Sequence, residues 1–187
     1  MSKRIFLAIK IHPEPELLDV FDLLREELAE EQIKWVDEEQ LHLTLKFFGE
    51  TPEPKIKEIA EVVKDCCMQH TWFSFDLCSP WYFRKQQQPA VIFLQVAGTG
   101  ELTAFQKDLD SRFSGLGIPK EQRDFKPHLT LGRIKSINDK EAFYELMKQF
   151  PRKTVQPVPV SEVILYESIL KPSGPEYRVL ERFKLVT

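Results

Sequence analysis

The tetrapeptide His-Leu-Thr-Leu occurs twice in this chain of 187 residues, at positions 42–45 and again at positions 128–131. The two copies are 86 residues apart, and shifting the chain by this offset also aligns two apolar runs, residues 4–9 and 90–95. Apolar runs of strand length that keep the same spacing to a repeated motif indicate an internal duplication. The sequence therefore predicts two copies of one unit, over about residues 4–84 and 90–170.

Between each apolar run and its motif, apolar residues recur with the spacing of an amphipathic helix. They are Leu17, Leu18, Phe21, Leu24 and Leu28 in the first copy, and Leu102, Phe105, Leu109 and Phe113 in the second. Helix patterns also follow the motifs, over residues 54–68 and 139–150, and strand patterns come next, over residues 72–77 and 158–165. Each copy is thus predicted to be β-α-β-α-β, and residues 176–186 add a closing strand.

We expect an α+β fold, with residues 1–187 forming a single bilobal domain of duplicated β-α-β-α-β units. Two mainly antiparallel sheets would face a central cleft across a pseudo-two-fold axis, with the helices on the outside. The stretch 85–89, which contains three consecutive glutamines, is the predicted inter-lobe loop. In this arrangement the two motifs face each other.

Composition narrows the possible functions. A formal net charge of −3 disfavours a protein that coats long nucleic acids, although a small phosphate site needs only a few donors. The N-terminal apolar run is too short for a signal or membrane segment, so we expect a cytoplasmic monomer without membrane contact or an obligate protein partner. Cys66, Cys67 and Cys78 form no C-x-x-C pair, which favours neither a disulfide framework nor a cysteine zinc site.

The motif carries groups suited to phosphate chemistry. Because side chains alternate along a strand, His42 and Thr44 share one face, as do His128 and Thr130, while the leucines point into the core. An imidazole exchanges a proton near neutral pH, and a hydroxyl donates a hydrogen bond to a phosphate oxygen. Two facing copies could bracket one phosphate, with one histidine taking a proton from water and the other protonating the departing alkoxide. A strained cyclic phosphodiester suits this arrangement, and no metal or other cofactor is required.

A single His-Leu-Thr-Leu has a simpler explanation, namely an amphipathic strand with one satisfied polar residue. Duplication argues against it, because two of only four histidines occupy equivalent positions of the repeat. The other two, His12 and His70, are interpreted as surface or helix-capping residues.

Two cations near the motifs are further candidates for phosphate binding. Alternation places Lys46 on the face of His42 and Thr44, whereas Arg133 falls opposite His128 unless the strand bulges or ends. Candidates for stacking on a terminal base are Phe6, Trp35, Trp81 and Tyr82. For Phe6, packing in the core is the alternative.

The residues around both motifs resemble the 2H phosphoesterase superfamily, and within it the RNA 2′,3′-cyclic phosphodiesterases, historically called 2′-5′ RNA ligases. The resemblance rests on residues 35–36, 41–50, 126–133, 165–168 and 174–180. It implies a bilobal fold and the metal-independent opening of a 2′,3′-cyclic phosphate at an RNA 3′ end to leave a 2′-phosphate. It also implies that His42 is the proton donor, that His128 is the proton acceptor, and that Thr44 and Thr130 bind phosphate.

Other functions stay open. The same histidine chemistry could act on a 2′-5′ oligonucleotide linkage or a small cyclic nucleotide metabolite, or could drive reversible 2′-5′ RNA ligation. A non-catalytic module that binds RNA ends is disfavoured, because both motifs keep their histidine and threonine.

Overall fold

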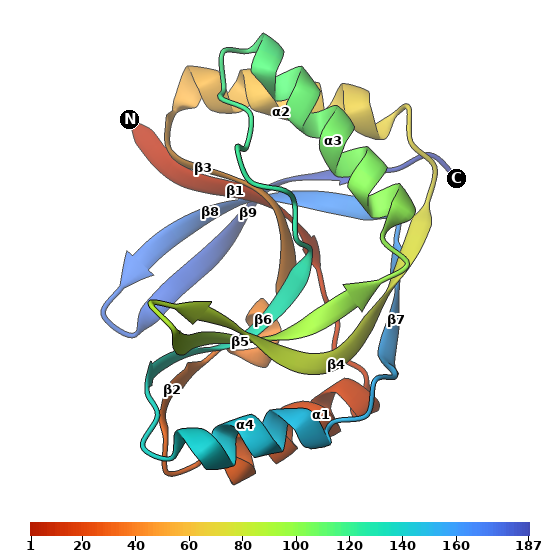
Figure 1. The fold of residues 1–187 in the computed structure, drawn as a ribbon. Coiled ribbons are helices and arrows are strands. Elements are labelled where there is room, and N and C mark those ends of the chain that lie inside the picture. Colours follow the sequence, from red (N-terminus) through yellow and green to blue (C-terminus); the bar gives the residue numbers. More distant parts are fainter.

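The computed structural model describes residues 1–187 as four α-helices and two antiparallel β-sheets (Figure 1). Sheet A has the strand order β3 (His42–Pro52), β1 (Ser2–Lys10), β8 (Glu162–Lys171), β9 (Gly174–Lys184). Sheet B has the order β2 (Gln32–Trp35), β6 (His128–Ser136), β5 (Gln88–Ala97), β4 (Phe73–Lys85), β7 (Thr154–Val160). The helices are α1 (Pro15–Glu27), α2 (Glu53–Cys67), α3 (Gly100–Gly115) and α4 (Lys140–Gln149), and a short 3₁₀ helix spans Glu38–Gln40. The α+β class with antiparallel sheets is confirmed.

The two copies of the repeat exchange their third strands. β1 from the first copy pairs with β8 from the second, while β5 from the second pairs with β4 from the first. The strand order β3-β1-β8 is therefore repeated as β6-β5-β4. The two sheets thus share a pattern of strand order, and each contains strands from both halves of the chain.

The predicted inter-lobe loop at residues 85–89 is instead a tight hairpin turn. β4 and β5 pair antiparallel up to Lys85 opposite Gln88, and the two residues between them, Gln86 and Gln87, have φ of 49° and 63°. A two-residue turn with positive φ at both positions has the twist that adjacent antiparallel strands need. This turn holds β4 beside β5 and so gives sheet B a strand from the first copy.

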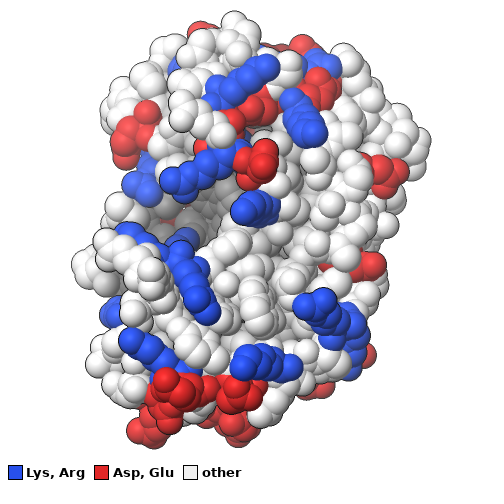
Figure 2. Space-filling view, in the orientation of Figure 1, with Lys and Arg blue, Asp and Glu red and all other residues white.

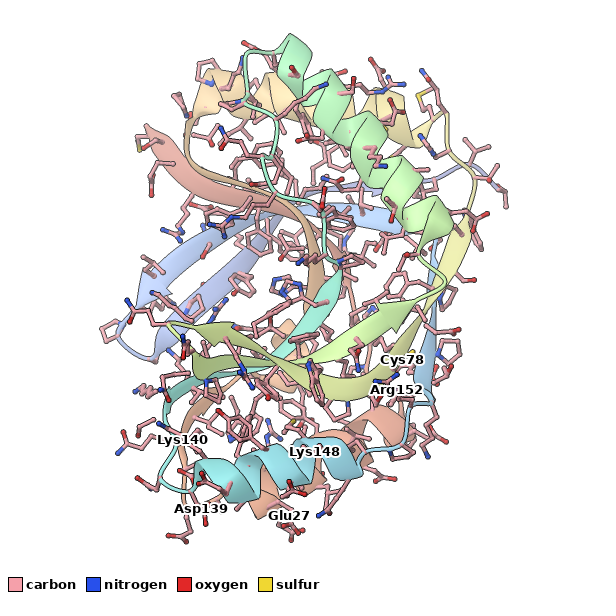
Figure 3. All side chains as sticks on the ribbon, in the orientation of Figure 1. Glu27, Cys78, Asp139, Lys140, Lys148 and Arg152 are labelled. Carbon is pink, nitrogen blue, oxygen red and sulfur yellow. The ribbon has the colours of Figure 1, made fainter.

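The helices cover the outer faces of the sheets, as predicted. In Figure 1, α2 and α3 lie above sheet A, and α1 and α4 lie below sheet B, so each pair also combines the two halves of the chain. Asp139 lies at the start of α4 (Figure 3), where its carboxylate accepts a hydrogen bond of 2.9 Å from the backbone N–H of Ala142. Such a cap satisfies one of the free N–H groups of a first helical turn. None of the helices is both long and apolar enough to cross a bilayer.

Two strands differ from the sequence pattern. The predicted strand at 158–165 is divided at Ser161 into the end of β7 and the start of β8. β7 is an edge strand of sheet B and carries Pro157 and Pro159. Proline has no backbone N–H, and on an edge strand this removes no hydrogen bond between strands. β2 has only four residues and was too short to give a periodic signal.

Candidate active site

The first residues of β3 and β6 bring both motifs to one cavity. His42, Thr44, His128 and Thr130 all line a cavity of about 670 Å³ between the two sheets. The intervening leucines of each motif are buried in the core, because alternation turns them to the opposite face of the strand. The four motif side chains therefore meet as the strand pattern predicts.

The two imidazoles are held in the same way. Nδ1 of His42 lies 2.7 Å from the carbonyl oxygen of Gln40, and Nδ1 of His128 lies 2.7 Å from that of Lys126. A carbonyl oxygen only accepts, so each Nδ1 carries the proton and donates it. Each Nε2 is left free to take up or release a proton, which is the role that acid-base catalysis requires.

Aromatic rings fix the orientation of both histidines. The ring centre of His42 lies 5.0 Å from that of Phe6 and 5.2 Å from that of Tyr177. His128 is packed similarly, 5.0 Å from Phe83 and 5.6 Å from Phe93. A ring held by packing and by a hydrogen bond keeps its free nitrogen at one place, which reduces the cost of ordering it during reaction.

The environment of His42 favours the neutral imidazole in the free protein. Burial is the largest cause of its lowered pKa, and the charges of Lys10, Arg133 and His128 lower it further, while the hydrogen bond to the carbonyl of Gln40 opposes them. Burial disfavours the charged form, and nearby cations repel a second positive charge. An anionic phosphate in the cavity would act in the opposite direction and favour protonated His42.

Arg133 lies on the cavity side, because β6 bulges directly after Thr130. Thr130 pairs with Phe93 and Gly132 pairs with Ile92. Ile92 and Phe93 are consecutive, so Leu131 is an extra residue in β6 that has no partner in β5. A bulge of one residue reverses the alternation beyond it. Consequently Arg133 lines the same cavity as both motifs.

Lys46 does not lie where simple alternation placed it. β3 has the equivalent bulge at Leu45, since Thr44 pairs with Ala8 and Lys46 with Leu7. The bulge turns Lys46 away from the cavity that the histidines share, and its ammonium is 2.6 Å from the carboxylate of Asp110. The expectation that Lys46 shares the face of His42 and Thr44 is therefore corrected.

The residue turned to the cleft side in its place is Phe47, which is 50% exposed. The offset of the repeat aligns Phe47 with Arg133 and Lys46 with Gly132. The sequence alignment of the two copies therefore already shows that Lys46 and Arg133 are not equivalent. Only the bulges in β3 and β6 show that Arg133 faces the site and Lys46 does not.

A second cavity, of about 830 Å³, adjoins the first and shares Thr44 and His128 with it. Aromatic side chains on its wall include Phe47, Phe83 and Phe125. Figure 2 shows a hollow bordered by Lys and Arg side chains, with Asp and Glu side chains close to its upper border and a further acidic group at the lower end of the molecule. The cations that line the two cavities are Lys34, Arg133, Lys171, Arg84, Arg123, Lys126 and Lys46. Of these, Lys46 is paired with Asp110 and Lys171 with Glu176.

Other residues of the site come from the β8–β9 hairpin. Tyr177 lines the first cavity and packs against His42, and the side-chain N–H of Gln40 donates to the carbonyl of Pro175 at 3.0 Å. Motif reasoning missed Tyr177, although it lies within a segment that carries the family resemblance.

The four aromatic candidates for base stacking fall into two groups. Trp35 lines the first cavity, and Phe6 lies beneath His42 with 3% of its surface exposed. Trp81 and Tyr82 line neither cavity. Only the first group is placed to influence a ligand beside the histidines.

Comparisons with known proteins identify the family of the chain. Residues 13–169 match the family model described as the 2′-5′ RNA ligase superfamily. A relative from Methanothermobacter thermautotrophicus, named RNA 2′,3′-cyclic phosphodiesterase, is 34% identical over 99% of this chain and 100% of its own. One of the same name from Thermotoga maritima is 37% identical over 78% of this chain and 76% of its own.

Solved structures share the fold. A crystal structure of a protein from Thermus thermophilus has a TM-score of 0.78 and 28% sequence identity, and covers 97% of each chain. The structure of E. coli LigT complexed with 3′-AMP has a TM-score of 0.72 and 21% identity, and covers 100% of each chain. The two-sheet arrangement is therefore found in both proteins.

Proposed function

The chain belongs to the 2′-5′ RNA ligase superfamily, and from this premise we propose that it hydrolyses the 2′,3′-cyclic phosphate at an RNA 3′ end to a 2′-phosphomonoester. The observation that carries the proposal is the shared cavity, in which two histidines, two threonines and Arg133 converge from equivalent strands. Relatives named RNA 2′,3′-cyclic phosphodiesterase, at 34% and 37% identity, support the choice of substrate.

In the proposed reaction, Nε2 of His128 accepts a proton from water as the water oxygen bonds to phosphorus. The bond between phosphorus and the ribose O3′ breaks, and Nε2 of His42 donates its proton to that oxygen. Hydroxyls of Thr44 and Thr130 donate hydrogen bonds to the non-bridging oxygens, and the guanidinium of Arg133 balances their charge. The reaction consumes one water and leaves a 2′-phosphate and a 3′-hydroxyl, with no step that needs a metal.

The assignment of His42 as the proton donor follows the family resemblance. Since burial and nearby cations lower the pKa of His42 in the free protein, the donor role requires bound substrate to restore the proton. A cyclic phosphate carries one negative charge and would lie beside His42, so it favours the protonated imidazole. Substrate binding and activation of the acid are thus coupled in this proposal.

The test uses chelator-treated protein and an RNA oligonucleotide that ends in a 2′,3′-cyclic phosphate. We expect turnover to a product with a 2′-phosphate, identified by comparison with synthetic 2′- and 3′-phosphorylated standards. Strict dependence on added metal would overturn the mechanism, and a 3′-phosphate product would overturn the proposed bond cleavage.

A second candidate is cleavage of a 2′-5′ linkage between nucleotides. It is favoured by the two adjoining cavities, which share Thr44 and His128 and so leave space on two sides of a phosphate held there. A 2′-5′-linked dinucleotide should then be cleaved, whereas its 3′-5′ isomer should not. If neither dinucleotide were cleaved, the second candidate would be excluded and only the cyclic phosphodiesterase activity would remain.

An RNA end or a small nucleotide is the binding partner that these proposals imply. The expected cytoplasmic location and monomeric state stay predictions.

A further inference from the structure

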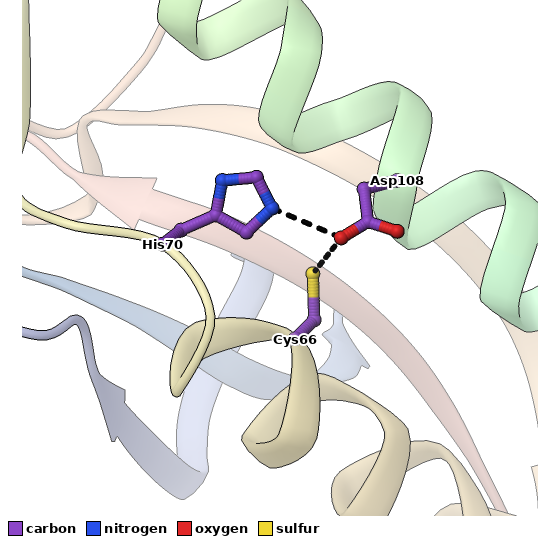
Figure 4. Close-up of side chains that lie close together, drawn as sticks. All are labelled: Cys66, His70 and Asp108. Atoms are coloured by element: carbon purple, nitrogen blue, oxygen red, sulfur yellow. Dashed lines mark hydrogen bonds and ion pairs between the residues drawn. The ribbon is translucent and has the colours of Figure 1, made fainter.

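A second group of reactive side chains lies outside both cavities, where the end of α2 packs on α3. Cys66 is in the last turn of α2, His70 follows that helix, and Asp108 projects from α3 toward both of them (Figure 4). Oδ2 of Asp108 is 2.9 Å from Nε2 of His70 and 3.4 Å from Sγ of Cys66. One carboxylate oxygen of α3 therefore contacts both a thiol and an imidazole from the C-terminal end of α2.

These separations are close to those of a zinc site. All three ligand atoms lie within 4.8 Å of one another. A tetrahedral Zn²⁺ holds oxygen, nitrogen and sulfur ligands at about 2.0 to 2.3 Å, which sets the ligand atoms roughly 3 to 4 Å apart. The two separations that involve Asp108, 2.9 Å and 3.4 Å, agree with that range.

The carboxylate is ionised and oriented. Nε of Arg112 donates to Oδ1 of Asp108 at 2.9 Å, and this hydrogen bond, with those from His70 and Cys66, lowers the pKa of Asp108 to about 2. Arg112 in turn donates to the side-chain oxygen of Gln69 at 2.6 Å. A ligand that is itself fixed by a neighbouring hydrogen bond is typical of metal sites.

The group is open to solvent on one side only. The side chains of His70 and Asp108 are 26% and 32% exposed, whereas Cys66 is fully buried behind them. A cation could enter from the exposed side, and a water molecule could occupy the fourth position there.

We propose that Cys66, His70 and Asp108 bind one thiophilic divalent cation of the Zn²⁺ class, with a water as the fourth ligand. On binding, the Cys66 thiol loses its proton to solvent, and neutral His70 offers the lone pair of Nε2 with its proton on Nδ1. The cation thus takes the place of the thiol hydrogen of Cys66 and the Nε2 hydrogen of His70, which in the free protein point toward Asp108. Because α2 comes from the first copy of the repeat and α3 from the second, the cation would join the two halves of the chain.

The sequence favoured no cysteine zinc site, because it contains no C-x-x-C pair and because His70 was interpreted as a surface or helix-capping residue. The third ligand is 38 residues from His70 and comes close only when α2 and α3 pack. The proposed site is distinct from the catalytic histidines and assigns no catalytic role to the cation.

The test is a titration of reduced, chelator-treated, full-length protein with Co²⁺, followed by Zn²⁺. We expect a thiolate-to-cobalt charge-transfer band at one equivalent, its loss when Zn²⁺ replaces Co²⁺, and a rise in Tm of about 5 °C or more at a hundredfold excess of Zn²⁺ over its Kd. Cys66→Ala and Asp108→Asn should each lose the band and the rise in Tm. If Cys66→Ala does not fold, Asp108→Asn alone tests the proposal.

Two matched controls make the result specific. Cys67→Ala removes the adjacent buried thiol, which is outside the group, and should keep the band. The double variant His42→Ala, His128→Ala should also keep it, and its loss there would place the cation at the catalytic histidines instead. No band in the wild type, or a band that persists in Cys66→Ala, would overturn the proposal.

Discussion

Gly132 occupies a position in β6 where even a methyl group would collide with neighbouring side chains. A Cβ built on Gly132 would lie 2.8 Å from Cε3 of Trp35 and 2.9 Å from Cγ2 of Ile33. Neither contact is easily relieved, because Cε3 belongs to a rigid indole ring and Cγ2 is one bond from the branched Cβ of isoleucine. Gly132→Ala should therefore displace β2 from β6, or push Trp35 toward the cavity that it lines.

The expected loss of stability follows from the cost of overpacking. One extra methyl group in a packed position costs about 1 to 3 kcal/mol. For a chain of this size, each kcal/mol shifts Tm by about 2 to 4 °C, so Gly132→Ala should lower Tm by roughly 2 to 12 °C. Since Gly132 lies between Thr130 and Arg133, displacements of a few tenths of an ångström should also lower kcat/KM by about tenfold.

Thermal unfolding and steady-state kinetics on a nucleoside 2′,3′-cyclic phosphate measure the two effects. Gly115→Ala is the matched control, because a Cβ at the end of α3 meets no atom within 4 Å. It should leave Tm unchanged or slightly higher, since alanine reduces the entropy of the unfolded chain. If Gly132→Ala matched Gly115→Ala in both Tm and kcat/KM, the packing argument would be refuted.

The remaining predictions concern charged groups in and beside the site. Lys46→Met should destabilise the fold by about 1 to 3 kcal/mol in urea unfolding, because it leaves the half-buried carboxylate of Asp110 without its cation, and should preserve kcat/KM of the folded protein; lost activity at unchanged stability would instead indicate a phosphate ligand. Arg133→Gln should lower kcat/KM by roughly 10- to 100-fold, as expected for a charge-assisted hydrogen bond, with Tm unchanged; unaltered kinetics would exclude Arg133 from the site. In an NMR titration, His42 should protonate below its ordinary pKa of 6.5, and inorganic phosphate should raise that midpoint; a midpoint at or above 6.5 without phosphate would contradict the burial argument. Because the folded state then binds the proton less readily than the unfolded chain, His42 should reduce stability as pH falls below 6.5, and His42→Gln should lose less stability between about pH 7 and pH 5.

The repeat and the alternation of the motifs predicted much of this structure. The offset between His42 and His128 located the equivalent strands β3 and β6, and the buried leucines beside each histidine follow from period-two alternation. Helical periodicity located all four helices, since each carries a continuous apolar stripe against its sheet. These features are local, so a single sequence contains them.

The remaining features depend on contacts between distant segments. The bulges at Leu45 and Leu131 turn Lys46 away from the histidines and Arg133 toward them, and alternation by itself cannot locate a bulge. The exchange of β4 and β8 between the sheets depends on strand pairing, which an apolar run does not specify. Neither feature leaves a local signal in the sequence.

In the proposed reaction, His42 gives a proton to the leaving O3′ and His128 takes one from water. The most direct test of this assignment compares kcat/KM for a nucleoside 2′,3′-cyclic phosphate with that for its analogue in which sulfur replaces the bridging O3′. A departing thiolate needs no proton, so the analogue bypasses general acid catalysis. On the oxygen substrate, His42→Ala and His128→Ala should each lose about 10²- to 10⁴-fold in kcat/KM. On the sulfur substrate, His42→Ala should recover to near the wild-type rate while His128→Ala stays impaired; recovery of His128→Ala instead, or of neither variant, would contradict the account.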